Sequence, residues 1–261
     1  MERHILTVDV EDNFTFDELA NKEDWPKYEG QVVENTLKIL SLLRQYNAGA
    51  TFFVVGMLAE RHPELVKYIM DDGHEIASHS YLHKSLRDVS MDDIEADIRK
   101  SSDILSSLTG EQVLGFRAMG YTIPQDEKTF YSLLKKHGYK YDSSKKKNME
   151  RNCQTIQKDH IYRVFPSSVN IYGLKTVFSG GTYLRLLPEF IINKGFSHYS
   201  MAGQPVMLYV HPWEFNRDQP KRNVRFKYKI LQSPLTFSTE RKLRLLLEKY
   251  EFVSIRKYIG V

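Results

Sequence analysis

The sequence predicts an α/β fold of one domain, a distorted barrel in which parallel strands alternate with helices. Three observations predict it. Short β-branched apolar runs alternate with longer segments of helical periodicity. The helical segments end at glycines or other stop signals. Finally, about six or seven such units favour a closed or nearly closed barrel of the (β/α)7 type, with an open doubly wound sheet as the alternative.

The alternation of strand and helix patterns runs through most of the chain. Residues 5–10 form a short β-branched run that ends in acidic residues, as in a buried strand, and residues 33–46 have amphipathic helical spacing. The remaining predicted strands are 50–55, 74–78, 113–118, 139–142, 205–210 and 252–255, and the remaining predicted helices are 57–70, 91–108, 126–137, 182–193 and 240–250.

Residues 1–261 are predicted to form a single domain. The periodic pattern is lost over residues 144–168, which we interpret as an irregular excursion and not as a linker. The apolar pattern returns in a C-terminal part, about residues 170–261, that belongs to the same domain. No internal repeat divides the chain.

Composition excludes several classes of protein. A chain of 261 residues with 41% hydrophobic content can bury a full core, and its formal charge of +4 does not indicate nucleic-acid binding. Cys153 is the only cysteine, which rules out an intrachain disulfide and a thiolate metal site. No apolar run is long enough for a transmembrane segment or a secretory signal, so a cytoplasmic location is expected.

Two histidines with metal-ligand spacing are the clearest local feature. His79 and His83 are four residues apart and would share one face if the segment began a helix. The alternative is an ordinary polar junction between a strand and a helix. Asp9, Glu11 and Asp12 follow the first apolar run, and in a parallel barrel they would lie at the strand end where active sites form. Two histidines and one carboxylate form a typical hydrolytic zinc site.

A third feature is His211, which ends the apolar run 205–210. A single histidine at such a position is often structural. Hydrolysis of an amide, however, needs an acid that protonates the leaving nitrogen, and histidine titrates near neutrality. His211 is therefore a candidate general acid.

The chain resembles the NodB-type polysaccharide deacetylases of carbohydrate esterase family 4 over nearly its whole length. The resemblance is closest to a subgroup associated with exopolysaccharide gene clusters, and the C-terminal part, about residues 170–261, is specific to the family. It rests on the motifs TVDVED (7–12), GHEIASHS (73–80) with His83, GFRA (115–118), YDSS (141–144), GGTYLRLLP (180–188) and HPWEF (211–215).

The resemblance implies a role for each motif residue. Asp9 would be the general base, His79 and His83 metal ligands, and His211 the general acid. The third ligand would be Glu11, with Asp12 as the alternative. Alternation along a strand also places Asp9 and Glu11 on one side. In addition, Arg117 would hold Asp9, Asp142 would orient His211, and the backbone N–H of Tyr121 would form part of the oxyanion hole.

The chain departs from the family pattern at Met119, where relatives usually have proline. The departure puts the turn that presents Tyr121 in question. Two further residues are candidates for substrate contact: Arg185, which follows a glycine pair and could grip a phosphate or carboxylate, and Trp213. A surface arginine is the alternative for Arg185.

The sequence therefore predicts an enzyme that removes N-acetyl groups from an amino-sugar glycan with the help of Zn²⁺, or of Co²⁺ or Ni²⁺ in its place. The basic segment 221–229 could face a nucleotide-linked or lipid-linked precursor, although such runs are often solvated surfaces. A deformylase or ureide hydrolase on the same scaffold is one rival function, and an inactive glycan-binding module is another.

Overall fold

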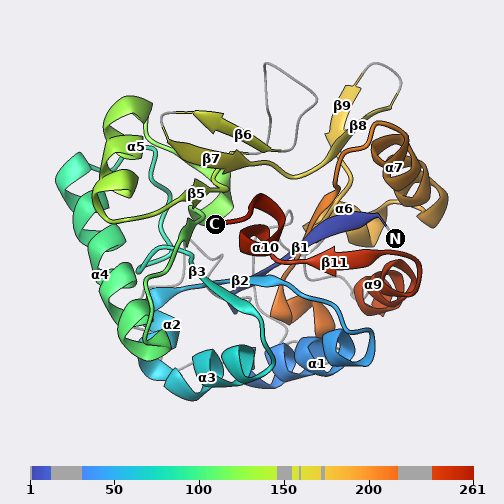
Figure 1. The fold of residues 1–261 in the computed structure, drawn as a ribbon, viewed down its shortest axis with the longest axis horizontal. Helices are drawn as coiled ribbons and strands as arrows, with labels where there is room; N and C mark the ends of the chain where they lie inside the picture. The colour runs from blue at the N-terminus through green and yellow to red at the C-terminus, as the bar shows by residue number, and fades with distance from the viewer. Residues whose placement is uncertain (1, 13–30, 146–154, 159, 172–173, 217–236) are drawn as a thin grey trace, which may run out of the picture.

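A curled sheet with helices on its outer side forms the body of the molecule in the computed structural model (Figure 1). The structure describes residues 2–12, 31–145, 155–158, 160–171, 174–216 and 237–261. The basic segment 221–229 therefore lies outside the described residues. No helix in the described ranges has the length and apolar character needed to cross a bilayer.

The main sheet has nine strands in the order β10-β1-β2-β3-β4-β5-β7-β6, with β11 beside β1. Every pairing in it is parallel except that of β6 with β7. Within the described residues the end strands β10 and β6 do not pair with each other, so the sheet is a half-barrel. This confirms the predicted distorted barrel of one domain. The strands are β1 (Arg3–Val10), β2 (Thr51–Val54), β3 (Glu75–Ser78), β4 (Gly115–Phe116), β5 (Tyr141–Asp142), β6 (Thr155–Lys158), β7 (Ile161–Val164), β10 (Met207–Val210) and β11 (Glu251–Val253), and β8 (Ser168–Ile171) and β9 (Leu174–Val177) form a separate hairpin.

Most predicted helices are present, but two of them are divided at prolines. Residues 57–70 form two helices that meet at Pro63, and residues 182–193 are divided at Pro188. Proline has no N–H to donate and disfavours helical backbone in the residue before it. The helices are α1 (Val32–Gln45), α2 (Gly56–Arg61), α3 (Pro63–Asp71), α4 (Met91–Thr109), α5 (Glu127–Lys136), α6 (Gly181–Leu186), α7 (Glu189–Met201), α9 (Phe237–Lys249) and α10 (Ile255–Ile259), with short 3₁₀ turns η2 (Met119–Tyr121) and η3 (Pro212–Phe215).

Strand β1 is buried on both faces, which explains its unbroken apolar run. Leu6, Val8 and Val10 pack into the larger cluster with the outer helices, whereas Ile5 belongs to the smaller cluster inside the curl. Because side chains alternate along a strand, the inner side of β1 continues from Ile5 to Asp9 and on toward Glu11. The acidic residues therefore emerge inside the curl.

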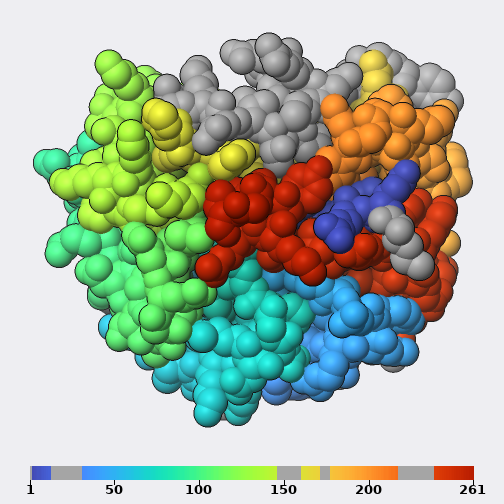
Figure 2. Space-filling view, in the orientation of Figure 1, coloured from blue at the N-terminus to red at the C-terminus, as the bar shows by residue number. Residues whose placement is uncertain are grey.

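The C-terminal helix α10 closes one end of the half-barrel. The backbone N–H of Ile255 donates to Thr51 Oγ1 at 2.8 Å, and that of Arg256 donates to Glu75 Oε2 at 3.0 Å. Thr51 and Glu75 begin β2 and β3, so α10 covers the amino ends of these strands. Figure 2 shows this C-terminal segment, in red, across the middle of that face. The carboxyl ends of the strands lie at the other end, where the candidate site forms.

Candidate active site

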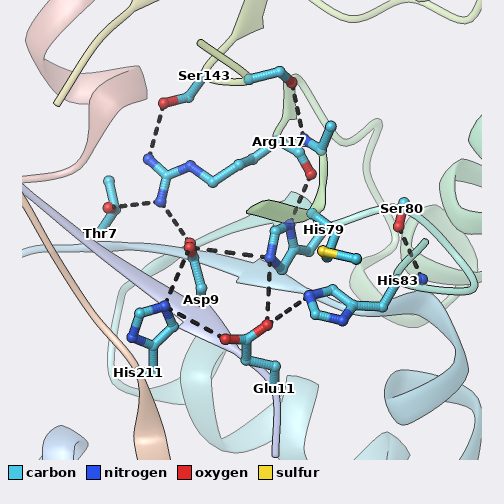
Figure 3. A network of polar contacts seen from close by, with 12 residues as sticks. Thr7, Asp9, Glu11, His79, Ser80, His83, Arg117, Ser143 and His211 are labelled. Carbon is cyan, nitrogen blue, oxygen red and sulfur yellow. Dashed lines mark hydrogen bonds and ion pairs between the residues drawn. The ribbon is translucent and has the colours of Figure 1, made fainter. Parts of the chain in front are cut away.

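Residues that are far apart in the sequence meet where the parallel strands end (Figure 3). Asp9 and Glu11 lie at the end of β1, His79 follows β3, Arg117 follows β4 and His211 follows β10. All five are buried, none more than 7% exposed. Groups of both charge signs are therefore concentrated in a place with little water, where electrostatic interactions are strong.

Glu11, His79 and His83 form a cluster that could hold a metal ion. Their ligand atoms all lie within 4.8 Å of one another. Glu11 Oε2 is 2.5 Å from His83 Nε2 and 3.8 Å from His79 Nε2. Asp12 is also buried but is not part of the cluster. Of the two carboxylates that the sequence left open, the structure therefore brings Glu11 to the histidines.

The histidines meet through a loop, and the expectation that they share a helical face is wrong. Residues 79–83 lie between β3 and α4 without helical structure, and Ser80 and His83 have φ angles of 60° and 51°. Asp97 on α4 stabilises the loop by accepting hydrogen bonds from the N–H groups of Tyr81 and Leu82, at 2.7 and 2.8 Å. The reversal of the chain is what turns His83 back toward His79.

The Nε2 atom of His79 is available to bind a metal ion. Its Nδ1 lies 2.7 Å from the Arg117 carbonyl oxygen, which can only accept, so Nδ1 carries the proton and Nε2 faces the cluster. Burial lowers the pKa of His79 to about 4, despite opposing charges from Asp9 and Glu11. A neutral imidazole with its free nitrogen directed at a carboxylate and a second histidine is the donor set that zinc prefers. The residues fit a divalent metal.

Asp9 is paired with a fully buried arginine, as the resemblance implies. Arg117 Nη1 donates to Asp9 Oδ1 at 2.5 Å and to Thr7 Oγ1 at 3.0 Å, and Nη2 donates to Ser143 Oγ at 2.9 Å. Burial alone would raise the pKa of Asp9, but the positive charges around it, first that of Arg117 and then that of His211, lower it. Asp9 is therefore held as a carboxylate that can accept a proton.

His211 faces the same carboxylates from the opposite side. Its Nε2 is 3.4 Å from Glu11 Oε1 and 3.9 Å from Asp9 Oδ2. Burial acts to lower the pKa of His211, but Glu11, Glu214 and Asp9 together outweigh it and raise the pKa to about 9. A histidine in this state carries a proton at neutral pH that it can donate.

The carboxylate that faces Nδ1 of His211 is Glu214 and not Asp142. Within the described residues Asp142 accepts hydrogen bonds from Ser144 and from Tyr131 Oη, and it makes no ion pair with His211. Glu214 Oε1 instead lies 3.4 Å from His211 Nδ1. The expectation that Asp142 orients His211 is therefore corrected. The signal for Glu214 was its place three residues after His211, the spacing of a capping box.

Arg185 and Trp213 are buried behind His211, with 4% and 6% of their surface exposed. The Trp213 ring stacks on His211 with centroids 5.2 Å apart, and the Arg185 guanidinium lies 4.9 Å from the Trp213 ring centroid. Both residues thus pack against protein, so the alternative of a surface arginine for Arg185 is wrong, and their contact with substrate stays a prediction. Arg185 belongs to the support of the site.

The turn around Met119 forms without proline. Gly120 and Tyr121 have φ angles of 60° and 59°, and the N–H of Tyr121 donates to the Ala118 carbonyl at 3.2 Å. The positive φ at Gly120 supplies the sharp turn. The N–H of Tyr121 is used within this turn, and its part in the oxyanion hole stays a prediction of the resemblance.

The fold and the site together define a class of protein, a parallel half-barrel with a carboxylate–histidine centre at its carboxyl end. Residues 13–142 match the family model for polysaccharide deacetylase. Residues 135–260 match the model of a domain of unknown function, DUF3473. The chain belongs to the NodB-type polysaccharide deacetylase family.

Relatives and solved structures agree with this membership. A peptidoglycan-N-acetylglucosamine deacetylase of Bacillus cereus is 43% identical over 82 residues, which are 31% of this chain and only 30% of that protein. A Mycobacterium smegmatis structure described as a polysaccharide deacetylase has a TM-score of 0.69 at 21% identity, over 99% of this chain and 88% of that one. An allantoinase has a TM-score of 0.66 at 15% identity, over 99% and 88% of the two chains. Both solved structures are therefore similar to this chain in fold.

Proposed function

We propose that this protein is a metal-dependent hydrolase that removes N-acetyl groups from an amino-sugar glycan. The observation that carries the proposal is the buried cluster of Glu11, His79 and His83, with Asp9 on one side and His211 on the other. A cluster with a base held by arginine and an acid whose pKa is raised contains each group that amide hydrolysis requires. The Bacillus cereus relative carries the name of an N-acetylglucosamine deacetylase.

The site residues divide the reaction between them. A divalent metal, Zn²⁺ or in its place Co²⁺ or Ni²⁺, would be held by Glu11, His79 and His83 and would polarise the carbonyl and acidify water. Asp9 accepts a proton from the attacking water, whose oxygen bonds to the carbonyl carbon. The C–N bond then breaks, its electron pair stays on nitrogen, and nitrogen takes the proton from His211 Nε2. The products are acetate and a free amine.

The substrate we propose is an amino-sugar unit of an exopolysaccharide or of its nucleotide-linked or lipid-linked precursor. The support is the resemblance to the exopolysaccharide subgroup and the basic segment 221–229, whose positive charge suits a phosphate-bearing carrier. A cytoplasmic place of action is part of this proposal, because precursors of this kind are made there.

The site supports the two rival functions to different degrees. Hydrolysis of a formamide or a ureide would use the same groups, and the allantoinase structure shares the fold. A module that only binds glycan would not need Asp9 and His211 as a base and an acid. Both residues lie at the site, and their pKa values are shifted in the directions that these roles need.

Purified protein loaded with Zn²⁺ tests the proposal. We expect acetate release from N-acetylglucosamine oligomers, loss of activity on chelation and recovery with Zn²⁺ or Co²⁺. The double variant His79→Ala/His83→Ala should retain little bound metal in elemental analysis, whereas His62→Ala/His198→Ala, with two histidines away from the cluster, should retain it all. Release of formate alone from matched N-formyl substrates would overturn the acetyl assignment.

A further inference from the structure

Glu214 is a fully buried carboxylate in the turn that follows His211. Its side chain is 0% exposed, and the turn η3 that carries it begins with Pro212 directly after β10. A buried carboxylate is costly unless charges or hydrogen bonds compensate for it. The residues around Glu214 therefore indicate what it does.

Glu214 holds His211 at two atoms. Its Oε2 accepts a hydrogen bond from the backbone N–H of His211 at 3.3 Å, and its Oε1 lies 3.4 Å from His211 Nδ1. The first contact determines where the main chain leaves β10, and the second determines which ring nitrogen faces away from the site. Together they leave Nε2 directed at Asp9 and Glu11.

Arg185 supports Glu214 from behind. Its Nε lies 3.6 Å from Glu214 Oε1, and its side chain is 2% exposed. Arg185 also packs on the ring of Trp213, which in turn stacks on His211. One carboxylate is thus placed between an arginine and a histidine, and the positive charge of Arg185 compensates for the burial of Glu214.

We infer that Glu214 is the positioning residue of the general acid and that Arg185 holds it in place. The charge of Glu214, 3.4 Å from His211 Nδ1, stabilises the proton on that nitrogen, so that the proton on Nε2 is the one transferred to the leaving nitrogen as the C–N bond breaks. This inference rests on the proposed function, because it gives Glu214 a task only in a reaction that needs an acid. It assigns to a motif glutamate and a buried arginine the work expected of Asp142.

The test compares two leaving groups. An amine must take a proton as it leaves, whereas p-nitrophenolate leaves without one. In Zn²⁺-loaded Glu214→Gln, kcat on an N-acetylglucosamine oligomer should fall about 10–100-fold with KM little changed. Hydrolysis of p-nitrophenyl acetate should change less than about threefold, since proton donation contributes little there. Arg185→Met should show the same selectivity to a smaller extent.

Two further variants separate positioning from general damage. Glu75→Gln removes a carboxylate at the opposite end of the half-barrel, which pairs with Thr51 and Tyr141, and should affect both substrates equally. In a His211→Ala background, Glu214→Gln should cost no further activity, because Glu214 acts through His211.

The outcomes distinguish the inference from the function on which it rests. If the wild-type protein releases no acetate from any N-acetylated sugar, the proposed function fails. If the wild-type protein is active but Glu214→Gln and Arg185→Met, with metal content retained, lower both hydrolyses equally, Glu214 is only structural and the inference is overturned. Additive losses in the His211→Ala background would overturn it as well.

Discussion

At the level of single residues, two carboxylates at the end of β1 have different surroundings. Asp9 is held by Arg117 at 2.5 Å, whereas Glu11 faces His83 at 2.5 Å. A carboxylate paired with arginine stays deprotonated, and a carboxylate beside two histidines is suited to share a metal cation with them. Neighbouring residues of one chemical type can therefore do different work.

The choice between Glu11 and Asp12 can be tested by metal binding. We expect Glu11→Gln to weaken zinc binding at least about 100-fold, since residues that merely support metal ligands are already worth about 10–100-fold. Asp12→Asn is the matched control and should change affinity less than about threefold. Competition with a chromophoric chelator measures both. The assignment of Glu11 is wrong if Asp12→Asn is the variant that loses zinc.

Arg117 predicts a pH effect with a definite sign. Its charge lowers the pKa of Asp9, and a base must be deprotonated to act. Arg117→Gln should therefore raise the pKa of Asp9, shift the acidic limb of the kcat/KM profile to higher pH, and lower kcat/KM by about 100-fold. Arg163→Gln, which removes a buried arginine that packs on Tyr131, should leave the limb in place. An unshifted limb in Arg117→Gln would show that Asp9 is not the base.

At the level of secondary structure, short irregular elements position the side chains of the site. The loop 79–83 reverses the chain through two residues of positive φ, and η3 turns the chain so that Glu214 returns to His211. The regular strands deliver Asp9 and His211 to one end, and these loops decide the final directions of the side chains. Function therefore depends on backbone that no helical or strand pattern describes.

Gly180 allows α6 to begin directly beside β10. It forms a bridge with Tyr209, its φ is 153°, and a Cβ at this position would collide with the Tyr209 carbonyl oxygen. Gly180→Ala should therefore destabilise the protein by about 1–3 kcal/mol in thermal unfolding. Gly203→Ala places a methyl group in open space at a φ of 63° and should cost only about 1 kcal/mol. Equal losses would mean that crowding against β10 is unimportant.

At the level of the whole molecule, the N-terminal strand is central to the sheet. β1 pairs with β10 on one side and, along different parts of its length, with β11 and β2 on the other. Ile5 is thus opposite both Met207 and Val253. The matches to two family models do not correspond to two folding units.

This interleaving predicts that the chain cannot be divided near residue 145. Residues 1–145 expressed alone would leave β1 without its neighbouring strands β10 and β11. We therefore expect that this fragment does not unfold cooperatively on heating. The same holds for residues 146–261, which lack β1. Thermal unfolding followed by near-ultraviolet circular dichroism compares both fragments with the full chain. A sharp transition in either fragment would contradict a single folding unit.

The sequence alone was sufficient for the features that depend on local pattern. Alternating apolar periods predicted the strands and most helices, and the acidic end of β1 and the histidines after β3 and β10 predicted where polar groups gather. Hydrophobic periodicity and strand direction are properties of neighbouring residues. They therefore determine which end of the sheet carries the site before any tertiary contact is known.

Tertiary structure decided what touches what within the site. The pairing of His211 with Glu214, the burial of Arg185 and the joining of Glu11 to two histidines depend on how α6, η3 and the loop 79–83 pack together. Exposure and charge pairing are set by residues distant in sequence, such as Arg185 and Glu214, whose approach no local period records. For that reason the sequence led to Asp142 as the partner of His211, and only the packed molecule showed Glu214 in that place.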